Sequence, residues 1–328
     1  MNEPKKPASP MAEPNPTWKD WLSAARLRTL PLAFAVIVLG SGLAVFESPA
    51  SFHGGVLALA LFTAFSYQVL SNFANDLGDG RRGTDAHKKG EQRAVASGRI
   101  SMRQMQRATS LFTALSLVSG TLLSVLAFHG QWPLQLTFIF LGALATWAAR
   151  SYTLGGNPYA YWGGGDLFVF LFFGLVGVVG SAALFARPQA YFLLPAAVAG
   201  AMSAAVLTLN NLRDQETDAA ARKRTLVVRY GTRWGRNYFK VLLGASNVLN
   251  LLFIFIVYWK DSQEGTAQLD AGALVGPIGV HFGLILALRY LSKQFAEATE
   301  PEPLDRLLKP MALITLAYCV ATALSLQF

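Results

Sequence analysis

Long apolar segments alternate with polar connections along most of the chain. Nine segments contain about 17 to 22 mostly apolar residues each, close to the roughly 20 residues with which an α-helix crosses the hydrocarbon core of a bilayer. Runs of this length with few charges predict membrane-spanning helices. We therefore predict an all-α, polytopic membrane protein with nine transmembrane helices in a bundle. The predicted spans are 30–46, 56–75, 108–128, 133–149, 166–185, 190–211, 238–259, 271–290 and 307–327.

The composition supports a membrane protein. The chain is 53% hydrophobic and only 14% charged, whereas soluble domains carry about 25% charged residues. Residues 1–17 differ from the rest, because they are rich in proline and polar groups and contain no apolar core, which excludes a cleavable signal peptide. We expect a disordered cytoplasmic tail over 1–17 and one transmembrane domain over 18–328.

Basic residues are concentrated on alternate connections between the predicted spans. Of the 28 lysines and arginines, 26 lie on the side of the N-terminus and the long loops, and only Arg187 and Lys260 lie on the other. The positive-inside rule predicts that the N-terminus and these loops are cytoplasmic and that the C-terminus is outside. The net charge of +9 follows first from this topology, and it can also attract anionic lipid or an anionic substrate. A nucleic-acid-binding protein would not sort its charges in this way.

Small residues recur in two of the predicted spans. Positions 197–205 read AVAGAMSAA, and positions 171–181 read LFFGLVGVVGS. Small side chains let helices approach closely in lipid, so we interpret both stretches as helix-packing surfaces.

The second predicted span ends in a group of amides and carboxylates, NFANDLGD at 72–79. Asn72, Asp76 and Asp79 stand at positions i, i+4 and i+7, so a continuing helix places them on one face. Asp85 follows in the loop.

A matching group, NNLRDQETD at 210–218, ends the sixth predicted span. Asn210, Asp214 and Asp218 stand at i, i+4 and i+8, again on one face of a helix. The separation from 72 to 210 and from 76 to 214 is 138 residues in both cases. Both groups end even-numbered spans and therefore lie on the same side of the membrane. This placement predicts an internal helical repeat whose halves bring two Asp-rich cytoplasmic loops together.

Carboxylates at the ends of neighbouring helices repel one another unless a cation neutralises them or their pKa values rise. Asp and Asn oxygens suit hard divalent cations, and Mg²⁺ completes its coordination with water and substrate phosphates. Basic side chains surround both groups, among them Arg81, Arg93 and Lys223. Carboxylates and basic groups at a membrane surface indicate a site for a Mg²⁺-bound diphosphate.

These motifs resemble those of a known family. NFANDLGD with Asp85, and NNLRDQETD followed by KRTLVVRYG, are similar to the paired Asp motifs of the UbiA superfamily of intramembrane prenyltransferases. The similarity is greater to the branch of 1,4-dihydroxy-2-naphthoate polyprenyltransferases, and it extends from about residue 18 to 328. Three further stretches carry it: WLSAARLRTLPLA at 21–33, RAVASGRIS at 93–101 and SYTLGGNPYAYWGGGDLFVFLFFG at 151–174.

The resemblance implies Mg²⁺-dependent transfer of a polyprenyl group from polyprenyl diphosphate to 1,4-dihydroxy-2-naphthoate. Diphosphate and CO₂ are then lost, and demethylmenaquinol is formed in menaquinone biosynthesis. It also implies that the protein lies in the cytoplasmic membrane of a bacterium, among membrane lipids. Prenyl chain length and oligomeric state stay open.

The resemblance also implies roles for individual residues. The expected catalytic carboxylates are Asp76, Asp79, Asp214 and Asp218. The expected metal ligands are these four and Asn72, with Asp85 as a possible addition. The expected substrate-binding residues are Arg81, Arg93 and Lys223 toward the diphosphate, Arg26, Arg28 or Arg150 toward the acceptor carboxylate, and Tyr152 toward the allylic cation.

Three positions depart from the pattern of the branch. Arg222 stands where Gly is common before KRT, Leu27 replaces a frequent Pro, and Asp166 stands where Glu is usual. None of them is an expected ligand, so they bear on loop geometry and acceptor details.

Two other functions are compatible with parts of the pattern. The same fold can prenylate another aromatic acceptor, such as 4-hydroxybenzoate. A secondary transporter can use intramembrane acids as ion sites, but transporters place these groups near the bilayer midplane, whereas the Asp residues here stand at the ends of the predicted spans.

Overall fold

The structure, a computed structural model, describes residues 13–84, 93–264 and 275–327. These residues form helices and no strand. Nine helical segments within them are long and apolar enough to cross a membrane. The predicted all-α, nine-helix membrane protein is confirmed. The possible ligand Asp85 and most of the predicted tail lie outside the described residues.

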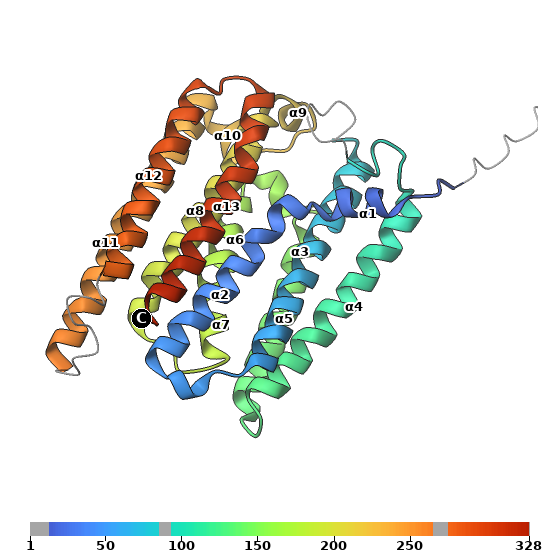
Figure 1. Ribbon diagram of the computed structural model, residues 1–328. Coiled ribbons are helices and arrows are strands. Elements are labelled where there is room, and N and C mark those ends of the chain that lie inside the picture. Colours follow the sequence, from blue (N-terminus) through green and yellow to red (C-terminus); the bar gives the residue numbers. More distant parts are fainter. Residues whose placement is uncertain (1–12, 85–92, 265–274, 328) are drawn as a thin grey trace, which may run out of the picture.

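The spans are built from helices of unequal length, some of them interrupted (Figure 1). The helices are α1 (Trp18–Ala25), α2 (Leu30–Glu47), α3 (Gly54–Arg82), α4 (Met102–Ala127), α5 (Trp132–Ser151), α6 (Gly165–Val169), the π-helix η4 (Phe170–Val179), α7 (Gly180–Ala183), α8 (Leu193–Arg213), α9 (Gln215–Ala220), α10 (Leu226–Tyr230), α11 (Thr232–Glu264), α12 (Val275–Glu297) and α13 (Pro301–Ser325). Two short 3₁₀ turns matter for the site: η1 (Leu27–Thr29) and η3 (Tyr159–Trp162).

Several helices continue beyond the spans predicted from hydropathy. Helix α3 ends at Arg82 instead of 75, and α4 begins at Met102 instead of 108. Local capping sets these ends: Gly83 adopts φ +71° after α3, and Ser101 forms a capping box with Gln104 at the start of α4. Hydropathy identifies the apolar part of a helix that faces lipid. It therefore does not predict the polar turns by which a helix extends beyond that part.

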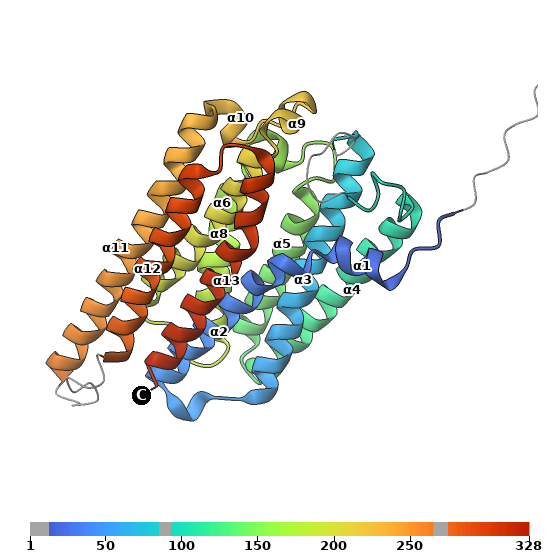
Figure 2. The ribbon, with the colours of Figure 1, turned by 45° about the horizontal axis from the view of Figure 1, so that its top comes forward.

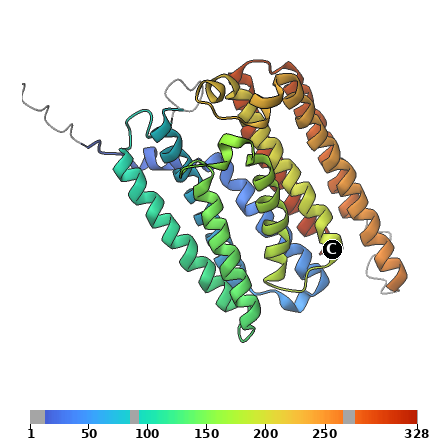
Figure 3. The same ribbon diagram turned by 180° about the vertical axis from the view of Figure 1, so that it is seen from behind.

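The helices run side by side in one bundle (Figures 1 and 2). Helix α8 lies at the centre and packs against η4, α11 and α13, while α2 packs against α13 and α3. Helices α11 and α12 form one flank, and α4 and α5 form the other, as the view from behind also shows (Figure 3). Large apolar side chains on the flanks are exposed, including Leu111, Phe140 and Phe282, as expected for contact with lipid.

The two acidic motifs lie at the same end of this bundle, which we call the polar end. It is the end at which α3 and α8 finish and α4 and α11 begin. The order of packing is also the same in both halves, since α3 packs on α4 and α4 on α5, as α8 packs on α11 and α11 on α12. This order agrees with the predicted internal repeat.

The two stretches of small residues, each predicted to be a helix-packing surface, pack against each other. Gly174 on η4 lies so near α8 that a Cβ atom there would be 2.7 Å from the carbonyl oxygen of Ala196. A Cβ atom at Gly200 on α8 would be 2.8 Å from the carbonyl oxygen of Phe170. The missing side chains therefore let α8 and η4 approach along their backbones.

Candidate active site

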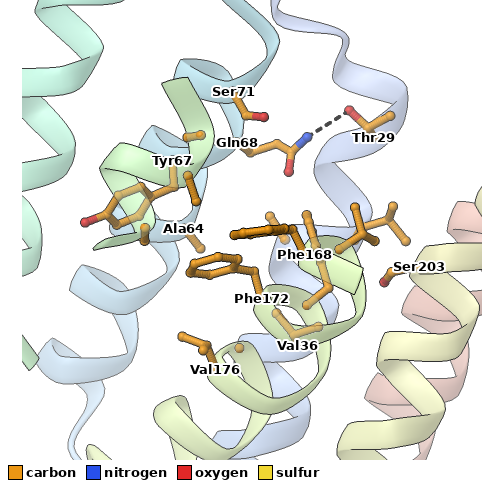
Figure 4. Close-up of a pocket in the computed structure, with 18 of the residues that line it drawn as sticks. Thr29, Val36, Ala64, Tyr67, Gln68, Ser71, Phe168, Phe172, Val176 and Ser203 are labelled. Atoms are coloured by element: carbon orange, nitrogen blue, oxygen red, sulfur yellow. Dashed lines mark hydrogen bonds between the residues drawn. The ribbon is translucent and has the colours of Figure 1, made fainter. Parts of the chain in front are cut away.

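A cavity of about 710 Å³ extends from the polar end into the bundle. Asp79, Asp214 and Asp218 line it where the acidic motifs meet. Deeper inside, its walls are mostly apolar. Figure 4 shows this change: Ser71, Gln68 and Thr29 lie together on one side of Phe168 and Phe172, and Val176 lies on the other. The cavity therefore offers a charged mouth, a polar middle and an apolar interior.

The first acidic motif presents Asn72, Asn75 and Asp79 to the cavity. Asp76 is not among the described residues that line it. Asp76 is 1% exposed, and its carboxylate accepts hydrogen bonds from the backbone N–H groups of Ala94 at 3.0 Å and Val95 at 3.2 Å. Asp76 thus fastens the segment after Arg93 to α3.

Helix geometry and the segment 93–95 together decide which side chains reach the cavity. At 3.6 residues per turn, positions four apart differ by about 40° around the axis, and neighbours differ by about 100°. Asn75 and Asp79 therefore point the same way. Asp76 stands four residues after Asn72 and shares its direction by this rule, but residues 94 and 95 bind its carboxylate and separate it from the cavity. Asn75 was missed in the sequence analysis, although the same i, i+4 spacing separates Asp214 and Asp218.

The second acidic motif presents Asn210, Asn211, Asp214 and Asp218 to the cavity. Asp214 follows directly after α8, and Asp218 lies one turn later on α9, where its backbone N–H donates to the Asp214 carbonyl at 2.8 Å. Aligned by cavity-facing side chains, Asn75 corresponds to Asp214 and Asp79 to Asp218. Both separations are 139 residues, one more than the predicted repeat.

Lys223 joins the two motifs. Its Nζ lies 3.6 Å from Oδ2 of Asp79 and 3.6 Å from Oδ1 of Asp218. Burial alone would lower the pKa of this ammonium, but the carboxylates of Asp79 and Asp218 raise it well above the usual 10.5. A buried cation therefore already sits between carboxylates from both motifs.

A third segment, between α5 and α6, also reaches the acidic motifs. The hydroxyl of Tyr161 on η3 donates to Oδ1 of Asp79 at 3.2 Å and shares a hydrogen bond of 2.7 Å with Thr84. The guanidinium of Arg82 lies 4.8 Å from the centre of its ring. Burial, with the nearby Asp79 charge, raises the pKa of Tyr161 to about 12. Sequence reasoning missed this role, because no local pattern singles out Tyr161 among the aromatic residues around it.

Three of the six predicted substrate-binding cations line the cavity: Arg26, Arg93 and Lys223. Arg26 occupies the left-handed region, with φ 50° and ψ 62°, at the turn between α1 and η1. Because of this turn, the side chains of Arg26 and Arg28 reach different surroundings although the two residues are only two positions apart: Arg26 lines the cavity and Arg28 contacts Asp305.

The other three predicted cations have partners outside the cavity lining. Arg28 pairs with Asp305 at 3.2 Å. Arg81 donates to Gln106 at 3.0 Å, and Arg150 donates to Thr113 at 3.0 Å. These three guanidinium groups therefore brace neighbouring helices.

Aromatic rings form one wall of the cavity below the carboxylates. Tyr152, Tyr159 and Phe168 line it, with ring centres 5.2 Å apart for the first pair and 4.1 Å for the second. Burial raises the pKa of Tyr152 to about 12, so its hydroxyl stays protonated. Phe73 on α3 does not belong to this wall, because its ring packs in the core between Trp21 and Phe112.

The polar middle of the cavity is formed by α3 and the turn before α2. Gln68 donates to the Thr29 hydroxyl at 3.2 Å, the dashed contact in Figure 4. Asn72 donates to the Ala25 carbonyl at 2.8 Å, which leaves its amide oxygen as an acceptor. Arg26 lines the same region.

The donor atoms at the mouth fit a hard divalent cation in combination with a phosphate ligand. They are carboxylate and amide oxygens, and the described residues that line the cavity include neither His nor Cys. Within the described ranges, no three acidic, His or Cys side chains lie close enough to hold a metal by themselves. Mg²⁺ commonly binds through one or two carboxylates and completes its shell with water and substrate phosphates. The spread carboxylates match that mode of binding.

Comparison with known sequences places this chain among prenyltransferases. The UbiA prenyltransferase family matches residues 33–294. The 1,4-dihydroxy-2-naphthoate octaprenyltransferase of Haemophilus influenzae is 42% identical over 241 residues, which cover 73% of this chain and 78% of the relative. The enzyme of the same name from Escherichia coli is 36% identical over 307 residues, or 93% of this chain and 95% of the relative.

Solved structures agree in fold. A UbiA homologue from Archaeoglobus fulgidus, bound to GPP and Mg²⁺, superposes with a TM-score of 0.63 and covers 94% of this chain and 100% of that one. Its sequence identity is 15%, so the likeness concerns the fold alone. The family match spans most of the chain and two relatives exceed 35% identity, which confirms the predicted family: this chain belongs to the UbiA prenyltransferase family.

Proposed function

We propose that this protein transfers a polyprenyl group from polyprenyl diphosphate to 1,4-dihydroxy-2-naphthoate, with loss of diphosphate and CO₂, to give demethylmenaquinol. One observation carries the proposal: a single cavity joins carboxylates from both acidic motifs to a long apolar interior. A diphosphate with a hydrocarbon tail has the same division between a charged head and an apolar body. The names of the bacterial relatives support the choice of acceptor.

The diphosphate is bound at the mouth of the cavity. Asn75, Asp79, Asp214 and Asp218 would hold Mg²⁺ there, with Asn72 beside them. This set takes Asn75 in place of the predicted Asp76, because Asn75 lines the cavity and Asp76 is not among the described residues that line it. When bound, Mg²⁺ would neutralise the diphosphate and so make it a better leaving group.

Two cations of the chain complete the diphosphate site. Lys223 and Arg93 line the mouth and take the remaining negative charge through charge-assisted hydrogen bonds. When the allylic C–O bond breaks, its electron pair leaves with the diphosphate, and the same groups stabilise the charge that develops.

The carbocation and its tail lie below the mouth. The rings of Tyr152, Tyr159 and Phe168 stand between the carboxylates and the apolar interior, so their π faces stabilise the allylic cation. The tail occupies the part lined by Phe172 and Val176, where an apolar environment avoids exposure of hydrocarbon to water.

The acceptor binds in the polar middle of the cavity. Arg26 pairs with the naphthoate carboxylate, and Thr29, Gln68 and Ser71 contact the ring hydroxyl groups. The ring carbon that bears the carboxylate attacks the allylic cation and forms the new C–C bond. The bond to the carboxylate then breaks, its electron pair restores the aromatic ring, and CO₂ leaves. Of the three arginines predicted for this role, only Arg26 is among the described cavity residues.

The polar end faces the cytoplasm in this proposal, and the protein lies in the inner membrane of a bacterium. The distribution of 26 of the 28 basic residues supports this orientation. The acidic residues lie at helix ends and not in the middle of the spans, which argues against an ion site at the bilayer midplane.

The test is turnover by the purified protein in lipid vesicles with Mg²⁺, polyprenyl diphosphate and an acceptor. We expect the mass of demethylmenaquinol, with one CO₂ and one diphosphate released per product, when the acceptor is 1,4-dihydroxy-2-naphthoate. Asp79→Asn is the inactive control. Product formed with 4-hydroxybenzoate alone would contradict the proposed acceptor, and absence of diphosphate release with any acceptor would contradict the reaction.

A further inference from the structure

Four charged side chains form a chain of alternating sign beside the second acidic motif. Nε and Nη2 of Arg213 donate to the two carboxylate oxygens of Asp214, each at 2.7 Å. Nη1 of the same guanidinium donates to Asp305. Nη1 of Arg28 lies 3.2 Å from each oxygen of Asp305. The order is therefore Asp214, Arg213, Asp305 and Arg28.

This chain connects three elements that are distant in sequence. Arg213 ends α8, Asp305 lies in the first turns of α13, and Arg28 belongs to η1. Helix α13 packs along both α8 and η1, and α8 and α13 lie next to each other at the polar end (Figures 1 and 2). Arg28 also precedes Thr29, which lines the polar middle of the cavity.

Arg213 is strongly confined. Its side chain is 1% exposed, while those of Asp305 and Arg28 are 24% and 22% exposed. A guanidinium this deeply buried requires carboxylate partners. The two hydrogen bonds from Arg213 fix the plane of the Asp214 carboxylate. The hydrogen bond to Asp305 holds the guanidinium from the other side.

We propose that Asp305 is a positioning residue for the diphosphate site, acting through Arg213 on Asp214. The inference rests on the proposed function, in which Asp214 is a metal ligand. A cation and the Arg213 guanidinium compete for the electrons of the same carboxylate. The Asp305 carboxylate partly neutralises the Arg213 guanidinium, so Arg213 competes less strongly with the cation for Asp214. Asp305 also holds the guanidinium in place. Outer partners of this kind commonly change metal affinity by 10- to 100-fold.

The decisive variant is Asp305→Asn, which keeps the shape of the side chain and removes its charge. Arg213 is then compensated by Asp214 alone, so Asp214 binds a cation less well. We expect the half-saturating Mg²⁺ concentration to rise on the order of 10-fold, with kcat at saturating Mg²⁺ nearly unchanged. Asp305→Glu restores the charge and should recover most of the affinity.

A second readout does not depend on turnover. Mg²⁺ with inorganic diphosphate should raise the thermal unfolding temperature of the wild-type protein, because a ligand stabilises the state that binds it. Asp305→Asn should need a higher Mg²⁺ concentration for the same rise. The matched control is Glu302→Gln on the same helix, where the Glu302–Arg306 pair is 78% and 74% exposed. It should behave as the wild type.

The outcomes separate this inference from the proposed function. If Asp214→Asn abolishes the Mg²⁺ response but Asp305→Asn leaves it unchanged, Asp305 has no positioning role, and the proposed function stands. If Asp214→Asn itself leaves the response unchanged, the proposed metal site is wrong. A loss of stability in Asp305→Asn without a shift in Mg²⁺ dependence means that the pair only supports the fold, which also overturns the inference.

Discussion

Asp79 and Asp218 share one cation although 139 residues separate them in the chain. Nζ of Lys223 lies 3.6 Å from a carboxylate oxygen of each. One residue thus belongs to the end of α3 and the other to α9, and the bundle brings both to the mouth of one cavity. The positive charge of Lys223 therefore offsets the repulsion between the carboxylates of the two acidic motifs.

Lys223→Met should weaken binding of the polyprenyl diphosphate. A hydrogen bond to a charged group contributes about 1.5–3 kcal/mol, so we expect KM for the diphosphate to rise by roughly 10-fold or more. Steady-state kinetics at saturating Mg²⁺ measure this effect. The neighbouring exposed Arg224 supplies the control, and Arg224→Met should leave KM unchanged. The pKa of Lys223 is raised well above 10.5, so its ammonium group stays protonated between pH 7 and pH 9. Titration of Lys223 therefore does not lower the affinity for the diphosphate in this range. Equal KM values in Lys223→Met and the wild type would contradict the assigned role.

Asp76 and Asp79 should differ in their effect on Mg²⁺ dependence. Asp79→Asn removes a carboxylate at the cavity, so it should abolish Mg²⁺-dependent transfer. Asp76→Asn disturbs the hydrogen bonds to Ala94 and Val95, so it should lower kcat through the displaced Arg93 segment and leave the half-saturating Mg²⁺ concentration nearly unchanged. Mg²⁺ titrations of both variants distinguish the roles. A large shift in Mg²⁺ dependence for Asp76→Asn would restore Asp76 as a direct ligand.

Tyr161→Phe should reduce catalytic efficiency without unfolding the protein. The change removes the hydroxyl that contacts Asp79 and Thr84 and keeps the ring beneath Arg82. A hydrogen bond to a charged group contributes about 1.5–3 kcal/mol, which corresponds to a decrease in kcat/KM of roughly 10- to 100-fold. Tyr230, which is 59% exposed on α10, provides the comparison, and Tyr230→Phe should have wild-type kinetics. An unchanged kcat/KM in Tyr161→Phe would show that the hydroxyl does not orient Asp79.

Arg222→Gly should stabilise the protein. Arg222 has φ 59°, in the left-handed region, which costs a non-glycine residue about 1–2 kcal/mol. The branch that this sequence resembles commonly has Gly here, and the structure supplies the reason. We expect a higher unfolding temperature with unchanged transfer. Arg224, whose φ is not positive, is the matched site, where Gly should be neutral or destabilising. A lower unfolding temperature for Arg222→Gly would mean that side-chain contacts outweigh the backbone strain.

The architecture could be predicted because it depends on local patterns. Nine apolar segments of membrane-spanning length are visible without any knowledge of contacts, and the described part of the chain forms nine helical segments of this kind. The cavity-facing carboxylates Asp79, Asp214 and Asp218 follow from helical periodicity at the ends of two such segments.

The remainder of the site depends on contacts between distant parts of the chain. Asn75 and Asp76 are neighbours on one helix, and only the segment 93–95 decides which of them faces the cavity. Arg26 and Arg28 carry the same charge, and only the left-handed turn at Arg26 and the distant Asp305 separate their roles. No sequence period reports such contacts.

The central claim is that both acidic motifs bind one Mg²⁺-diphosphate head group. Calorimetric titration of a short allylic diphosphate into the purified protein, with and without Mg²⁺, tests it most directly in the wild type, Asp79→Asn and Asp218→Asn. We predict one Mg²⁺-dependent binding event in the wild type, and loss of most of its affinity in each variant alone. Wild-type affinity in either variant would contradict the claim, because the head group would then be held by a single motif.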